Sequence, residues 1–237
     1  MKKIGVAFFV MYLYSHFALA VCLVADAQWK AGEYEQAMVN YENCAYKKND
    51  AIAQYTLANF YLDGNDYIKQ DIRHALFFLR LSAENGYAPA QRMLALLIDD
   101  LENLGEVGEK GLNDWKQQMK RLGFSDIPAF SWLLLAADKQ ENKWFYPTPG
   151  DVDEEAIRLA DSWTNKRGSD EKGLATQMAV AWKQIRLIKS AKVLLNPVEF
   201  ESFLKIMETK ETGSDIRNRK KRAMDRVKQV WEVKKNL

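Results

Sequence analysis

Residues suited to catalysis are sparse in this sequence. Histidine occurs at two positions, and only His74 follows the apolar N-terminal stretch. A metal site with several histidine ligands is therefore excluded beyond that stretch, and a Ser-His-Asp triad would have to use His74. This residue lies within a helical pattern, so we expect a structural or solvated side chain. The sequence has no phosphate-binding glycine loop, nucleophile elbow or paired-His zinc motif.

Carboxylates cluster at two places. One pair is Asp99 and Asp100, and a second group lies within residues 151–155 at an expected helix start. Acids are favoured there by the helix dipole, so their position needs no catalytic role. A lone acidic residue acting as in a cell-wall-cleaving enzyme stays an alternative, but no carboxylate stands out. We expect a non-catalytic protein without metal or cofactor.

The two cysteines, Cys22 and Cys44, have a spacing that suits a disulfide. The turn of a predicted helical hairpin lies near Gly32, about ten residues after one cysteine and about eleven before the other. In an antiparallel hairpin such residues lie side by side, because both helices rise ~1.5 Å per residue. We predict a disulfide if the chain is exported, and two packed thiols if it stays in a reducing cytosol.

The N-terminus has the pattern of a secretory signal peptide. Lys2 and Lys3 precede the apolar run 4–14, and residues 18–20 form an Ala-Leu-Ala cleavage motif. We expect cleavage before Val21 and export to a bacterial periplasm or cell envelope.

Other interpretations of this segment stay open. Residues 25–27 form a weaker second cleavage site, and the apolar run 4–24 is long enough for an uncleaved membrane anchor. Residues 19–22 are similar to a lipoprotein box, but Val21 departs from the small residue that this pattern has before Cys22.

Charge is distributed unevenly along the chain. Without residues 1–20, basic and acidic residues are balanced at 32 each. Residues 216–237 nevertheless contain nine Lys or Arg against two acids, a net +7, so the remainder carries −7. This is the pattern of a basic tail on an acidic body and argues against a nucleic-acid binder. With 48% hydrophobic residues, the chain is able to bury a core.

The motif Ala-x-Ala-Gln occurs three times, at 25–28, 51–54 and 88–91, with spacings of 26 and 37 residues. Such periods are typical of stacked helical hairpins. In the middle copy, apolar residues recur at helical spacing, residues 63–66 break the helix, Asp71 caps a second helix and Gly86 follows it.

This middle unit resembles the Sel-one-like repeat, a relative of the tetratricopeptide repeat, over residues 51–91. The residues that match the repeat pattern are Ala53, Gln54, Leu57, Tyr61, Gly64, Ile68, Asp71, Ala75, the run Ser82-Ala83-Glu84-Asn85-Gly86, Ala90 and Gln91. Ser82 departs from the family's alanine. The resemblance implies an all-α fold, a short solenoid over residues 21–163, and a protein–protein adaptor or scaffold.

The units on either side match the repeat less well. Residues 31–33 form a tight loop in the first unit, and a short amphipathic helix at about 112–122 interrupts the third. We expect a polar linker over 164–173, and a C-terminal helical region over 164–237 that has a capping box at Asn196 and Glu199. The aromatic loop 144–149 is a candidate ligand platform, with packing onto the core as the alternative.

A solenoid presents its first helices on a concave face, where we expect an unidentified protein partner to bind. The side chains that packing does not use there, and that we predict to contact the partner, are Gln54, Tyr55, Asn59, Arg92 and Asp99.

The basic C-terminal helix has an apolar stripe formed by Ile216, Ala223, Val227, Val230 and Trp231. Such a stripe must be covered. The protein's acidic body, an anionic membrane and an acidic partner are the candidates, so a membrane-associated assembly factor is the alternative function. Nucleic acid is disfavoured for an exported chain.

Overall fold

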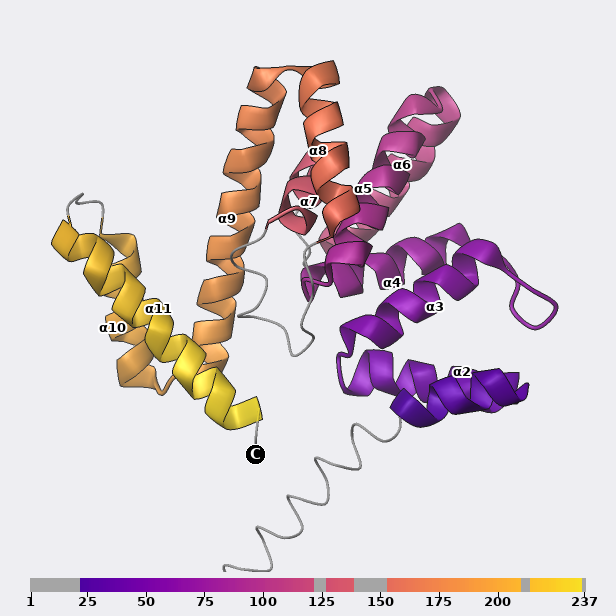
Figure 1. Ribbon diagram of the computed structural model, residues 1–237, viewed down its shortest axis with the longest axis horizontal. Coiled ribbons are helices and arrows are strands. Elements are labelled where there is room, and N and C mark those ends of the chain that lie inside the picture. The colour runs from indigo at the N-terminus through magenta and orange to yellow at the C-terminus, as the bar shows by residue number, and fades with distance from the viewer. Residues whose placement is uncertain (1–21, 122–126, 139–152, 210–213, 236–237) are drawn as a thin grey trace, which may run out of the picture. The chain divides into compact units, whose positions relative to one another are not determined.

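The computed structural model describes residues 22–121, 127–138, 153–209 and 214–235, and these contain helices and no strand (Figure 1). The predicted all-α class is confirmed. A helix covers residues 22–31. The elements after it are α2 (Tyr34–Glu42), the π-helical segment η1 (Asn43–Lys47), α3 (Ala51–Asp63), α4 (Ile72–Glu84), α5 (Ala88–Asn103), α6 (Glu106–Arg121), α7 (Ala129–Ala136), α8 (Glu154–Arg167), α9 (Ser169–Leu194), α10 (Pro197–Glu208) and α11 (Ser214–Lys235). The predicted leader 1–20 and the aromatic loop 144–149 lie outside the described residues.

The chain divides into two compact units, Met1–Ala179 and Val180–Leu237. The division falls inside α9, downstream of the boundary at 163/164 that we expected. The predicted linker over 164–173 is wrong, because only Gly168, with a φ of 88°, separates α8 from α9. Polar composition there marks solvated helix ends rather than a loop.

Local capping explains why α3 and α4 form a hairpin. The Asp50 carboxylate accepts from the Ala53 amide at 2.7 Å at the start of α3. The Asp71 carboxylate accepts from the Arg73 and His74 amides at 2.9 and 3.1 Å at the start of α4. Both satisfy amides that a helix leaves unpaired in its first turn. The predicted cap at Asp71 is therefore confirmed.

The turn between these helices requires glycine at one position. Gly64 has a φ of 65°, and a Cβ atom there would lie 2.9 Å from the backbone nitrogen of Gln70. The hairpin then closes antiparallel, since the Ser82 hydroxyl near the end of α4 donates to the Ala51 carbonyl at 2.6 Å. Ser82 thus satisfies a buried acceptor.

Small residues form the core of the first unit. Positions 37 residues apart in α3 and α5 are equally buried, and these pairs are Ala51 and Ala88, Ala53 and Ala90, Gln54 and Gln91, Leu57 and Leu94, and Ala58 and Ala95. Alanine lets neighbouring backbones approach closely, so α3 packs on α4, α4 on α5, and α5 on α7.

A buried arginine on α4, paired with Glu84 of the same helix, connects two of these layers. The Arg80 guanidinium donates to the Glu84 carboxylate at 2.7 Å, and the Arg80 side chain is 2% exposed. Its central carbon lies 4.8 Å from the ring centroid of Trp132, which is fully buried on α7. This contact between a cation and an aromatic face connects α4 to α7.

The helix inserted in the third unit is longer than we predicted. It covers Glu106–Arg121 and packs on α5 with one face, burying Leu112, Trp115 and Met119. These three residues follow the i, i+3, i+7 spacing of an amphipathic helix.

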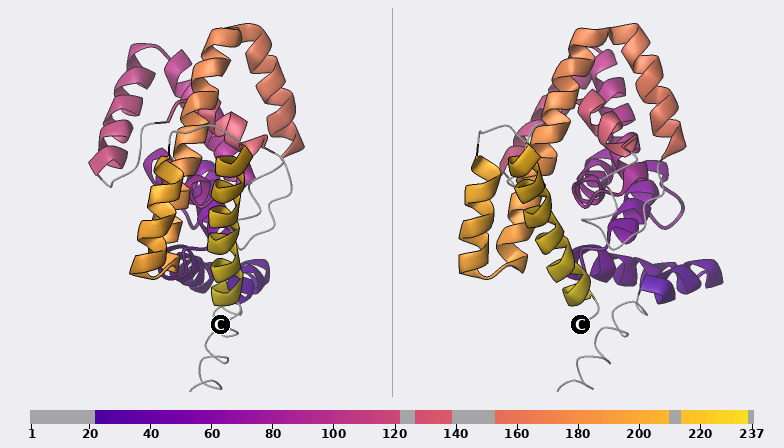
Figure 2. Two further views of the ribbon diagram at one scale, coloured as in Figure 1. Left: turned by 90° about the vertical axis from the view of Figure 1, so that its left-hand side faces the viewer. Right: turned by 60° about the vertical axis from the view of Figure 1, so that its left-hand side comes forward.

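In the second unit, α10 begins at the predicted capping box. The Asn196 side chain accepts from the Glu199 amide at 3.0 Å, and the Glu199 carboxylate accepts from the Asn196 amide at 3.3 Å. Helices α10 and α11 run side by side (Figures 1 and 2) and bury Phe203 and Val227. At Val227, the apolar stripe of the basic helix is therefore covered by α10.

Candidate functional site

Gln54 does not lie on a partner-binding surface, and this prediction is wrong. The residue is fully buried, and its amide nitrogen donates to the Ala45 carbonyl at 2.9 Å and to the Asn49 side chain at 3.0 Å. Its amide oxygen accepts from Asn85 at 2.9 Å. The side chain is thus committed to joining η1 to the α3–α4 hairpin.

The third copy of the repeated glutamine has the same role. Gln91 is fully buried, and its amide nitrogen donates to the Ala83 carbonyl at 3.1 Å. In both units the glutamine donates to a carbonyl near the end of the preceding helix. In its second and third copies, the Ala-x-Ala-Gln motif therefore packs successive hairpins together.

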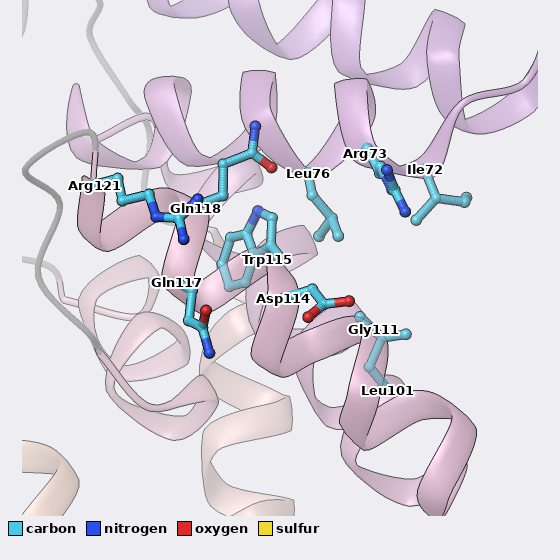
Figure 3. A pocket seen from close by; sticks show the side chains of 10 residues that line it. All are labelled: Ile72, Arg73, Leu76, Leu101, Gly111, Asp114, Trp115, Gln117, Gln118 and Arg121. Carbon is cyan, nitrogen blue, oxygen red and sulfur yellow. The ribbon is translucent and has the colours of Figure 1, made fainter.

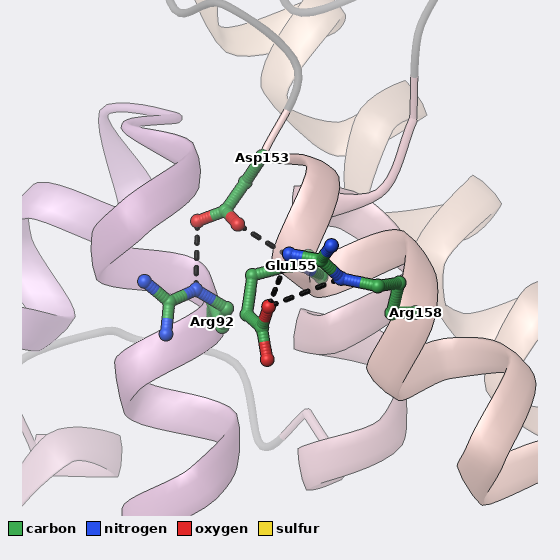
Figure 4. Close-up of polar contacts among 5 residues, drawn as sticks. Arg92, Asp153, Glu155 and Arg158 are labelled. Atoms are coloured by element: carbon green, nitrogen blue, oxygen red, sulfur yellow. Dashed lines mark hydrogen bonds and ion pairs between the residues drawn. The ribbon is translucent and has the colours of Figure 1, made fainter.

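Arg92 and Asp99 are likewise engaged within the protein. The Arg92 guanidinium donates to the Asp153 carboxylate at 2.8 Å (Figure 4). Asp153 also caps α8, accepting from the Ala156 amide at 3.0 Å. Seven residues further along α5, Asp99 pairs with Arg167 in the last turn of α8. These two predicted contacts instead connect α5 to α8.

Of the five predicted contact residues, Tyr55 and Asn59 have partly exposed side chains. The Tyr55 ring packs edge-on against Tyr87, with 5.2 Å between ring centroids. Gln54, Arg92 and Asp99 thus make contacts that hold the fold together, whereas Tyr55 and Asn59 are partly exposed.

The predicted disulfide between Cys22 and Cys44 is present, with the two Cα atoms 5.8 Å apart. It joins the first helix to η1. Beside it, the Tyr41 hydroxyl donates to Asp26 at 2.6 Å. Burial, reinforced by this hydrogen bond and the nearby negative charge, raises the pKa of Tyr41 well above its usual value.

His74 has the structural role that we expected. Its Nδ1 lies 2.8 Å from the Asp71 carboxylate, and its side chain is exposed. Hydrogen bonds from the His74 ring and amide lower the pKa of Asp71. The pair therefore belongs to the cap of α4. The described residues contain no cluster of three metal-ligating side chains.

A pocket of about 650 Å³, the α4–α6 pocket, lies between the exposed face of α4 and the inserted helix α6 (Figure 3). Its lining residues come from α4, α5 and α6 and are Ile72, Arg73, Leu76, Leu101, Gly111, Asp114, Trp115, Gln117, Gln118 and Arg121. A neighbouring hollow of about 430 Å³ shares Arg73 and Gln118 and adds the rings of Tyr46 and Phe77.

The pocket combines an apolar base with a polar rim. In Figure 3 the Trp115 ring stands among the lining side chains, with its nitrogen directed toward α4. Trp115 is 6% exposed, yet its indole nitrogen donates to no acceptor in the described residues. A buried donor without an acceptor costs about 1–3 kcal/mol, which an acceptor on a bound ligand would recover.

Sequence reasoning missed this pocket. The inserted helix was recognisable from its apolar spacing, and Ile72 and Arg73 stood at a predicted helix start. Their proximity depends on how α6 leans against α5, which no local pattern specifies. A usable signal was Trp115, a large aromatic residue within an otherwise polar segment.

Comparison with known proteins adds no relative, since no family model, curated protein or solved structure matches this chain. Among the described residues, no helix combines the length and apolarity needed to cross a membrane.

Proposed function

We propose that this protein is a non-catalytic protein–protein interaction adaptor that holds a segment of its partner in the α4–α6 pocket. The observation that carries the proposal is the partly apolar pocket with an unused, buried indole N–H. An acceptor such as a peptide carbonyl would satisfy Trp115, while Ile72 and Leu76 would contact apolar side chains. Such pockets, apolar with a few placed polar groups, are typical of binding sites.

The arginines of the first unit indicate the charge of the partner. Residues 1–179 contain six arginines, and four of them form ion pairs with carboxylates, namely Arg80, Arg92, Arg158 and Arg167. The two without an ion pair in the described part of the chain, Arg73 and Arg121, both line the pocket. Asp114 is the one carboxylate in the lining. We therefore expect a segment with acidic and apolar residues, because guanidinium groups bind carboxylates.

We also propose that the first unit is a short solenoid of Sel-one-like hairpins. The shared packing role of Gln54 and Gln91 supports this, as do the equally buried positions in α3 and α5. The pocket then lies on the second helix of a hairpin and on the insertion, rather than on the concave face formed by first helices. Tyr55 and Asn59 would be left on that face.

The proposed setting is the periplasm or cell envelope of a bacterium. The disulfide supports an oxidising compartment, because such bonds are rare where glutathione keeps thiols reduced. The signal-peptide pattern of residues 1–20 agrees with export.

Selection from a phage-displayed peptide library tests the proposal. Enriched peptides are expected to pair Asp or Glu with large apolar residues. Replacing Arg73 and Arg121 by Glu should abolish their binding, while replacing Lys30 and Lys110 by Glu changes the charge equally and should preserve it. If both variants lose peptide binding equally, or if the enriched peptides lack acidic residues, the α4–α6 pocket is not the binding site that we propose.

A further inference from the structure

The structural division of the chain coincides with a division of charge. Val180–Leu237 contains 15 Lys or Arg and seven Asp or Glu, a net +8, whereas Met1–Ala179 has a net −6. The basic character is therefore wider than the C-terminal helix and belongs to a whole compact unit. A positive unit of this kind attracts anionic surfaces.

Two of its cations hold the α10–α11 hairpin. The Arg226 guanidinium donates to Glu199 at 2.7 Å, and the Lys220 ammonium donates to the Thr209 carbonyl at 2.8 Å. Together with buried Val227, these contacts fix which face of α11 is turned toward α10. The remaining cations are consequently held in a defined orientation.

One flank of α11 carries three arginines, of which the hairpin uses Arg226. Arg219, Arg222 and Arg226 follow each other at i, i+3 and i+7, which places them on the same side of the helix. Arg219 and Arg222 are exposed and form no ion pair within the described residues. The flank thus presents concentrated positive charge to solvent.

Two exposed apolar side chains belong to the same compact unit as this flank. Val193 at the end of α9 and Val198 at the start of α10 are each 77% exposed. Val198 precedes Glu199, the residue that holds Arg226, so it lies close to the cationic flank. Lys192 is exposed beside Val193. Apolar groups next to cations are the combination that interfacial membrane proteins use.

We propose that Val180–Leu237 binds the surface of an anionic phospholipid bilayer, with the α11 flank facing the headgroups and the two valines entering the interface. The exposed valines favour a bilayer over a wholly polar anionic surface, because they can enter the apolar layer beneath the headgroups. Trp182 and Phe203 are buried, so neither ring is available for stacking on a nucleic-acid base. The disulfide also indicates a compartment poor in nucleic acid.

Co-sedimentation of the full chain with phosphatidylcholine vesicles, with and without phosphatidylglycerol, tests this inference. Each cation near an anionic surface is worth about 1 kcal/mol, or roughly five-fold in affinity. Replacing Arg219 and Arg222 by Gln should therefore weaken binding to anionic vesicles by roughly 30-fold. The matched control replaces Lys30 and Lys110 by Gln, which removes equal charge from the first unit and should leave binding unchanged. All proteins carry the same N-terminus, so ratios of affinity isolate the α11 charges.

A second pair of variants separates insertion from charge. Changing Val193 and Val198 to Ser should weaken binding by about ten-fold or more, since burying a valine is worth about 1.5–3 kcal/mol. This loss should persist at about 1 M salt, where the Debye length of about 3 Å removes most of the charge effect. Unchanged helicity in all variants checks folding.

Three outcomes would overturn the proposal. Equal binding to vesicles with and without phosphatidylglycerol would exclude charge recognition. Equal binding of the arginine variant and its control would exclude the α11 flank. Tighter, salt-sensitive binding to a DNA or RNA oligonucleotide than to anionic vesicles would identify nucleic acid as the partner. The Arg73 and Arg121 variant should bind vesicles normally, so this inference and the adaptor function fail independently.

Discussion

Removing the disulfide should destabilise the first unit without unfolding it. The bond joins residues 22 positions apart, and the chain-entropy cost of leaving such a loop open in the unfolded state is about 3 kcal/mol. The perturbation is replacement of Cys22 and Cys44 by Ala. The native state should persist, because other contacts keep the first helix docked. Trp29 stacks on Phe60 with ring centroids 3.9 Å apart, and Tyr41 bonds to Asp26.

Thermal unfolding monitored by circular dichroism measures the effect. In domains of 150–250 residues, about 1 kcal/mol shifts the melting temperature by about 2–4 °C, so the variant should melt about 6–12 °C lower. Adding a reductant should lower the melting temperature of the wild type by a similar amount and leave the variant unchanged. Native helicity should match before the transition.

Thiol alkylation and thermal unfolding can each contradict this prediction. If alkylation followed by intact-mass measurement finds two free thiols in natively folded, exported protein, the bond does not form. If the bond forms but the variant melts within about 2 °C of the wild type, the entropic mechanism is wrong for this loop. Loss of helicity before melting would mean that the noncovalent contacts do not hold the first helix.

Substitutions at three further residues, Gln54, Asp153 and Tyr41, test other parts of the first unit. Gln54→Ala should cost about 2–4 kcal/mol in urea unfolding, because it removes three buried hydrogen bonds, whereas Asn59→Ala on the same helix should cost less than about 0.5 kcal/mol. A stable Gln54 variant that loses peptide binding would instead restore its role as a contact residue. Asp153→Asn keeps a capping oxygen but removes the charge that pairs with Arg92, so it should cost less than about 1 kcal/mol, and Asp153→Ala should cost about 1 kcal/mol more; equal costs would mean that the cap contributes nothing. Tyr41→Phe should cost about 1–2 kcal/mol near neutral pH, and because the folded pKa of Tyr41 is raised, this difference should be constant below about pH 10 and shrink at higher pH as the unfolded phenol ionises; a pH-independent difference in unfolding free energy up to strongly alkaline conditions would contradict the assignment.

Much of the fold could be predicted because the relevant signals are local. Asp71, Gly64 and the capping box at Asn196 act on backbone groups within a few residues, so their types and spacing are sufficient. The disulfide followed from helix geometry about a single turn. Each of these predictions needed only the chain near the residue concerned.

The errors arose where a polar side chain satisfies a distant group. Gln54 was predicted to be a position that packing does not use, but its amide joins Ala45, Asn49 and Asn85 in a hydrogen-bond network. A signal was available, since glutamine recurs at the same place in a motif otherwise made of alanine. A polar residue repeated among packing residues indicates a buried hydrogen bond as readily as a surface contact.

Arg92 and Asp99 show a second limit. Their seven-residue spacing puts them on one face of α5, and an acid and a base stand at opposite ends of α8. The sequence contains these charges, but pairing them requires knowing that α8 lies beside α5. The α4–α6 pocket has the same requirement, because it exists only through the way α6 leans on α5.

In the C-terminal helix, the apolar stripe and the cationic flank have different roles. Its apolar stripe indicates that something must cover it, and α10 does so at Val227, the nearest available partner in the chain. At Val227 the stripe is therefore evidence for the hairpin. What remains for a ligand is the cationic flank at Arg219 and Arg222, which the hairpin orients but does not use. The choice between a membrane and another anionic surface then depends on the exposed valines of the same unit, because charge alone fits any anion.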